Sequence, residues 1–148
     1  MADDVVGVTT FCDDIRQERG NKYSLMGCYG HELILDEIPA ILPRVCAHVV
    51  VSMPISALPE NLTIRARIKD DVIGEVGVPP GDLAAILEKL EKQGLNDASR
   101  INLQVVMGFS PLVVPGDIML RILVETELGE SGAGRLAIRK RNESDPAF

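Results

Sequence analysis

The sequence has few aromatic residues: Phe, Trp and Tyr make up 3% of its 148 residues, and Trp is absent. Proteins use flat rings to stack on nucleic-acid bases, so this scarcity argues against a stacking surface. Val, Ile, Leu and Met must therefore fill the core. The hydrophobic content of 46% is enough for a real core, which excludes a disordered chain.

Positive charge is also in short supply, because 15 Lys and Arg face 22 Asp and Glu and give a net charge of −7. Such a surface repels nucleic acid and anionic lipid, and we predict no nucleic-acid and no membrane partner. The one basic run, Arg139-Lys140-Arg141, is followed by Glu143 and Asp145. We interpret this run as a solvated strand end rather than as a phosphate site.

Features of exported and membrane proteins are missing as well. No apolar run approaches the roughly 20 residues that cross a bilayer. Residues 1–10 carry acidic residues where a signal peptide carries basic ones. The three cysteines, Cys12, Cys28 and Cys46, are an odd number without a C-x-x-C spacing. We therefore expect a cytoplasmic protein with free thiols.

What the sequence has in abundance is period-two alternation of apolar and polar residues, the pattern of half-buried strands. The alternation is clearest in four segments, residues 45–53, 61–71, 101–109 and 117–126. It is weaker in four more, at about 4–12, 22–29, 72–78 and 134–140. Turn sequences such as RGNK, KDDV and GESGAG separate the strands, and EIPAILPR and SPLVVPG are expected to be proline-punctuated loops, the second a loop or an edge segment.

One segment, PPGDLAAILEKLEKQGL, changes to a helical period. It predicts an amphipathic helix at about 82–94, with Asp82 as N-cap, Gly94 at the C-terminal cap and a Glu88–Lys92 pair. We expect this helix to cap an open end or edge of the strands, and partner docking is the alternative.

About eight strands with one helix, and no alternating strand–helix units, predict a mostly β protein. The expected architecture is an antiparallel two-sheet β-sandwich. We expect one domain at 1–141 and a flexible C-terminal tail at 142–148, because the tail is polar and contains proline.

The stretch FCDDIRQERGNKYSLMGCYG resembles the N-terminal signature of a family of small, uncharacterised bacterial and phage proteins. In that signature a strand ends in Cys-Asp-Asp-Ile-Arg, and a Gly-Asn or Gly-Gly turn with Lys leads to a Gly-x-Tyr strand. The matching positions lie in the first third of the chain: Cys12, Asp13, Asp14, Ile15, Arg16, Glu18, Gly20, Lys22, Gly27 and Tyr29. The resemblance implies a sandwich of the same general type as calcium-dependent lipid-binding or transthyretin-like domains. It implies no activity, substrate or catalytic residue.

Two acidic pairs are the candidate metal ligands, Asp13 with Asp14 and Asp70 with Asp71. Calcium takes six to eight oxygen ligands, and a sandwich that gathers both pairs at one end would form such a loop cluster. Neither pair has the spaced Asp-x-Asp pattern that wraps an ion. We therefore predict no metal, and we interpret Asp14 as an acceptor of backbone N–H groups at a strand end.

The cysteines and the histidines His31 and His48 are the candidates for a zinc site or a Cys-His-Asp nucleophile. Zinc ligands usually come in close pairs, and here only Cys46 and His48 are close, although adjacent strands can bring Cys12 or Cys28 beside them. No nucleophile elbow is recognisable, and GESGAGR opens no helix that would support a phosphate loop. We predict no catalytic residue and no cofactor, and we expect the cysteines to be core residues.

Apolar residues on nominally outer faces carry the functional prediction. Met119 and Leu123 lie on the polar face of their strand, and Leu112, Val113 and Val114 form an apolar segment between two prolines. They favour a non-enzymatic protein that acts by binding a protein partner or by forming a homo-oligomer. The alternative is a ligand- or ion-binding module that uses the loops with Asp13/Asp14 and Asp70/Asp71.

Overall fold

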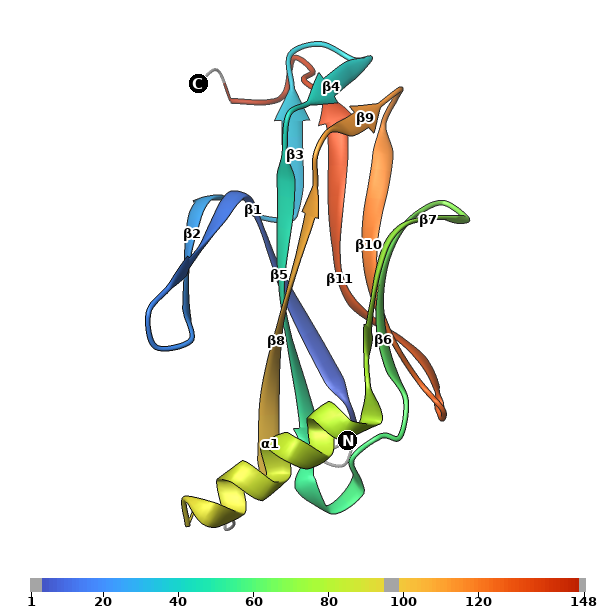
Figure 1. Ribbon diagram of the computed structural model, residues 1–148. Coiled ribbons are helices and arrows are strands. Elements are labelled where there is room, and N and C mark those ends of the chain that lie inside the picture. Colours follow the sequence, from blue (N-terminus) through green and yellow to red (C-terminus); the bar gives the residue numbers. More distant parts are fainter. Residues whose placement is uncertain (1–3, 95–98, 147–148) are drawn as a thin grey trace.

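The computed structural model describes residues 4–94 and 99–146. Two sheets pack face to face, and one α-helix lies at one end of them (Figure 1). The first sheet has the order β2-β1-β5-β8, with β1 (Val6–Glu18), β2 (Lys22–Cys28), β5 (Val45–Pro54) and β8 (Arg100–Phe109). The second has the order β3-β11-β10-β6-β7, with β3 (Glu32–Leu35), β6 (Leu62–Ile68), β7 (Asp71–Val78), β10 (Ile118–Thr126) and β11 (Gly129–Lys140). The predicted mostly β two-sheet sandwich is confirmed.

Period-two alternation places the core between the two sheets. In β6, Ile64 and Ala66 are buried, whereas Arg65 and Arg67 lie on the outer face. Phe11 and Phe109 are the buried aromatics of the described residues. The rest of the layer is aliphatic and comes from both sheets, with Val49, Val51, Leu120, Ile122, Leu136 and Ile138 among its members. This is the aliphatic core that the lack of aromatics predicted.

The first strand is longer than the sequence predicts, because β1 continues to Glu18 rather than ending near residue 12. Its first half pairs with β5, up to Cys12, and its second half pairs with β2. The β1–β2 hairpin therefore projects sideways from the sandwich (Figure 1). Both faces of this projection are largely open to solvent, so its charged residues show no clear alternation.

The last strand is also longer than predicted. GESGAG, expected to be a turn, forms the first half of β11 and pairs with β10 throughout. A register shift between Ile122 and Leu123 leaves Ala133 as the extra residue of a bulge. Small residues there permit a close approach of the sheets, since Gly7 of β1 lies against Ala133.

The structure has eleven strands among its described residues, against the eight expected. The extra strands are short. β3 pairs with β11 in parallel, an exception to the antiparallel rule. β4 (Ala40–Leu42) and β9 (Leu112–Val114) form a small third sheet inside the two proline-rich segments, of which the first was expected to be a loop and the second a loop or an edge segment. Prolines flank these strands and do not interrupt them, which is why the ladder survives.

The helix α1 (Pro80–Lys92) begins two residues earlier than predicted. Its N-cap is Pro79, which makes no side-chain cap, and Asp82 lies in the first turn, where a negative charge favours the helix dipole. The predicted Glu88–Lys92 pair is present at 3.1 Å. A short 3-10 turn, η1 (Ile55–Ala57), follows β5. None of the described helices has both the length and the apolar character needed to cross a bilayer.

Candidate functional site

The three cysteines lie side by side across the first sheet. Cys12 of β1 is the register partner of Cys28 in β2 and of Cys46 in β5. Cys12 and Cys46 are buried, Cys28 is exposed, and all three are free thiols. Adjacent strands therefore do place the three cysteines in one register row.

Asp13 anchors the end of the β1–β2 pair. The carboxylate of Asp13 accepts a hydrogen bond from the hydroxyl of Tyr29. The backbone N–H of Tyr29 donates to the carbonyl of Phe11 at 2.8 Å. Gly27, opposite Asp13, has φ +66°, and a Cβ there would lie 2.2 Å from Oδ2 of Asp13. Burial, and then the bond to Asp13, raise the pKa of Tyr29, so its hydroxyl stays protonated and donates.

Arg44 closes the other side of this cluster. Its Nε lies 3.1 Å from Oδ1 of Asp14 and 3.2 Å from Sγ of Cys46. Oδ1 of Asp14 also accepts the backbone N–H of Ile15 at 2.9 Å. The interpretation of Asp14 as an acceptor of a backbone N–H group is confirmed, although it lies inside β1 rather than at a strand end.

The electrostatics of the cluster do not favour a nucleophile. Burial, and then the neighbouring thiols of Cys46 and Cys28, raise the pKa of Cys12 to about 11. The Cys12 thiol is therefore protonated near neutral pH, and the thiolate is the form that attacks or binds a metal. The Nε2 atom of His48 is engaged with Oε1 of Gln104 at 2.7 Å. Within residues 4–94 and 99–146, no three Cys, His, Asp or Glu side chains are grouped to hold a metal ion.

The two acidic pairs do not converge. Asp13 and Asp14 belong to β1 of the first sheet, whereas Asp70 lies in the exposed turn between β6 and β7 of the second and Asp71 begins β7. Asp13 and Asp14 are also occupied by Tyr29 and Arg44. The loop cluster needed for the ion-binding alternative is therefore not formed.

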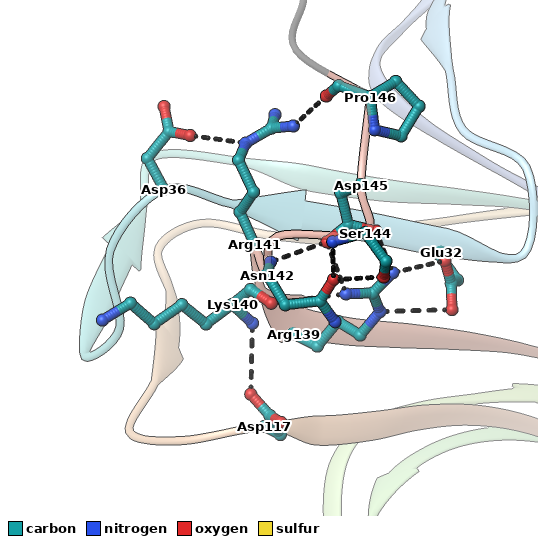
Figure 2. Close-up of polar contacts among 10 residues, drawn as sticks. All are labelled: Glu32, Asp36, Asp117, Arg139, Lys140, Arg141, Asn142, Ser144, Asp145 and Pro146. Carbon is teal, nitrogen blue, oxygen red and sulfur yellow. Dashed lines mark hydrogen bonds and ion pairs between the residues drawn. The ribbon is translucent and has the colours of Figure 1, made fainter.

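Two members of the basic run at the end of β11, Arg139 and Arg141, are paired with acidic side chains (Figure 2). Arg139 binds Glu32 at 3.2 and 3.3 Å and Asp145 at 2.7 and 2.9 Å, and Arg141 binds Asp36 at 2.9 Å. The sequence assigned residues 142–148 to a flexible tail. These contacts hold residues 142–146 against the end of β11, and residues 147–148 lie outside the described residues. The physical reason is the ion pair between Asp145 and Arg139, which the polar character of the tail did not reveal.

Part of the outer face of the first sheet, where β1, β5 and β8 lie together, has no charged residue in its register rows. Arg100 of β8 borders this part, and its Nε donates to Oγ of Ser52 at 2.8 Å. Three register rows of three residues cover this part, without an Asp, Glu, Lys or Arg: Val6, Ser52 and Asn102; Val8, Val50 and Gln104; Thr10, His48 and Val106. We call these nine residues the uncharged face. Val8 is 63% exposed and Val6 45%. In a chain with 25% charged residues, a two-dimensional array of this kind is a candidate contact surface.

The other apolar segments singled out in the sequence are only partly free. Leu112 and Val114 are buried, and Val113 is exposed beside Ile41 of β4. Met119 and Leu123 are both half-buried, so they do not form a fully exposed pair.

The apolar stripe of α1 covers an edge of the sandwich. Leu83 enters the core, and Ile86 borders a groove of about 550 Å³ between β7 and β8. The expectation that the helix covers an edge of the sandwich is thus confirmed.

Two residues that contact Asp13 and Asp14, namely Tyr29 and Arg44, are not predicted by the pattern of residues in the sequence. Arg44 follows a proline in an expected loop, and nothing in its spacing connects it to Asp14 or Cys46. Only the resemblance to the bacterial and phage family points to Tyr29, because Tyr29 is one of its matched positions together with Asp13 and Gly27. No family model, curated protein or solved structure matches this chain.

Proposed function

We propose that the protein is non-enzymatic and acts by binding another protein chain, a second copy of itself in the first instance, through the uncharged face. The observation that carries the proposal is the array of nine uncharged outer residues with Val6 and Val8 exposed among them. A two-fold interface brings the same patch of both copies together. The nine residues carry no charge of their own, with Arg100 at their border, so two copies of the patch can meet without repulsion between these residues. The apolar residues of the patch gain from leaving water.

The chemistry of the cysteine row supports the non-enzymatic part of the proposal. A protonated Cys12 and a His48 engaged with Gln104 are poor parts for nucleophilic catalysis. The free thiols support a cytoplasmic location. We also propose membership of the small bacterial and phage family that the N-terminal stretch resembles, because its matched positions Asp13, Gly27 and Tyr29 meet in space.

Sedimentation velocity over a range of protein concentrations tests the proposal. The wild type should show a sedimentation coefficient that rises with concentration. Val8→Lys should remain monomeric, because association would bury two positive charges, one from each copy, in the same interface. Val113→Lys is the matched control, since Val113 is 57% exposed on the small β4–β9 sheet. A wild type that stays monomeric throughout, or equal loss of association in both variants, would contradict the role of the uncharged face.

A further inference from the structure

Three arginines stand in one row on the outer face of the second sheet. Arg121 of β10 is the register partner of Arg67 in β6 and of Arg135 in β11. Neighbouring strands lie about 4.8 Å apart, so the row brings three positive charges within about 10 Å at the backbone. Like charges directly opposite one another destabilise a sheet. The three like charges therefore destabilise the folded sheet, and the fold itself gives no reason for placing them together.

The next register row shows how this sheet compensates an arginine. Arg65 is held by Glu75 at 3.0 Å and by Glu125. In contrast, Arg67 has only Glu130 at 3.5 Å, and its Nε is buried without a hydrogen-bond acceptor in the described part of the chain. Arg121 and Arg135 are exposed and have no ion pair with a described carboxylate. Of these three guanidinium groups, only that of Arg67 therefore has an ion pair with a described carboxylate.

The surface is hollowed on both sides of Arg121. One hollow, of about 410 Å³, is lined by the basic residues Arg67, Lys69 and Arg121, by the acidic residues Asp70 and Glu130, and by Met119 and Leu123. The second, of about 260 Å³, lies between Arg121 and Arg135 beside Gly132 and Gly134. A Cβ added at Gly132 would meet no atom within 4 Å, so the missing side chain keeps this hollow open.

We propose that the row of Arg67, Arg121 and Arg135 binds an anionic peptide segment of a partner protein, bearing carboxylates or a phosphorylated side chain. Guanidinium groups bind both anions in bidentate fashion, and arginine clusters recognise acidic and phosphorylated motifs. The half-buried Met119 and Leu123 beside the row match apolar residues of a peptide, which a free phosphate would not use. The net charge of −7 disfavours a long nucleic acid. This site lies on the sheet opposite the uncharged face and does not depend on self-association.

Fluorescence anisotropy with three labelled peptides of equal length tests the proposal. The first alternates Glu with Leu, the second has phosphoserine in place of one Glu, and the third has Gln in place of every Glu. The first two should bind the wild type, more weakly as salt rises, and the Gln peptide should not. The tighter of the two anionic peptides identifies the source of the negative charge.

Substitutions assign the binding to the row. Arg121→Gln with Arg135→Gln should weaken binding at least about tenfold, since each removes charge-assisted hydrogen bonds. The control, Arg16→Gln with Arg19→Gln, removes the same charge from the β1–β2 hairpin and should leave affinity unchanged. Gly132→Leu should fill the open hollow and weaken binding without a change of charge. Glu130→Gln should strengthen it, because this carboxylate competes for Arg67.

Four results would overturn the proposal. The first is that the Gln peptide binds as tightly as the anionic peptides. The second is that the control variant loses as much affinity as the Arg121 and Arg135 variant, and the third is that the latter keeps the wild-type affinity. The fourth is that none of the three peptides binds while inorganic triphosphate does. The last result would assign the row to a free anion.

Discussion

The guanidinium group of Arg139 and the carboxylate of Asp145 form two parallel hydrogen bonds, of 2.7 and 2.9 Å, at the end of β11 (Figure 2). The side chain of Asp145 is 7% exposed. It also accepts the backbone N–H of Asn142 at 2.8 Å, so it ties the segment after β11 back onto the sheet. Arg139 at the same time holds Glu32 of β3, and this single residue therefore joins the edge strand to the C-terminal segment.

The ion pair predicts acid sensitivity. Hydrogen bonds from Arg139, and then from the backbone of Asn142, lower the pKa of Asp145 from 3.8 to about 2. A carboxyl group whose pKa is lower in the folded state stabilises the protein above its unfolded pKa, and this stabilisation is lost as pH falls from about 4 to about 2. Asp145→Asn should therefore lower the free energy of unfolding at pH 7, and should lose less stability than the wild type between pH 4 and pH 2.

Urea unfolding at a series of pH values measures this difference. Asp71→Asn, at the exposed start of β7, is the control for the loss of one carboxylate. Parallel profiles for Asp145→Asn and the wild type would show that Asp145 does not titrate as the structure implies.

Gly27 should not tolerate a side chain. Its φ of +66° disfavours other residues, and a Cβ would lie 2.2 Å from the Asp13 carboxylate that Tyr29 holds. Gly27→Ala is expected to lower the free energy of unfolding by about 1–3 kcal/mol. Gly30→Ala is the control, because a Cβ there meets nothing within 4 Å, and should change stability by less than about 0.5 kcal/mol. Equal stability of the two variants in urea unfolding would contradict the role of Gly27.

Alternation in the sequence predicted the sandwich because the inner face of each long strand must be apolar, as Leu120, Ile122 and Val124 of β10 are. It failed where a strand leaves the core. The second half of β1 pairs only with β2, so neither face requires a pattern. The glycine-rich start of β11 has few side chains to pattern, and its pairing partner β10 decides its structure instead.

The candidate site was predictable only in part. The cysteine row follows from the register of three strands. Register depends on turn geometry and on which face of each strand is buried, and strands considered one at a time do not show it. Arg44 is far from Asp14 in sequence, and Arg67 is far from Arg121 and Arg135. The sequence shows each as one charge among many, and only strand pairing shows that three positive charges share a row.

The cysteine row predicts unequal thiol reactivity. Cys28 is exposed, whereas Cys12 and Cys46 are fully buried, and the pKa of Cys12 is raised to about 11 by burial first. At pH 7.5 the native protein should react with a thiol reagent at Cys28 alone, and the unfolded protein at all three cysteines. Peptide mass mapping after alkylation identifies the labelled residues. Rapid native labelling of Cys12 would show a thiolate that the structure does not support, and would reopen the catalytic interpretation.

The arginine row predicts that one substitution stabilises the sheet and that its neighbour does the opposite. Arg121 stands between Arg67 and Arg135, so Arg121→Gln removes two like-charge contacts and should raise the free energy of unfolding by about 0.2–1 kcal/mol. Arg65→Gln, one row along, breaks the contacts to Glu75 and Glu125 and should lower it. Urea unfolding at low salt measures both effects, and added salt should reduce them. A loss of stability in Arg121→Gln would mean that the arginines support the fold. A gain would mean that the row is kept although it lowers stability, as residues of a binding surface often are.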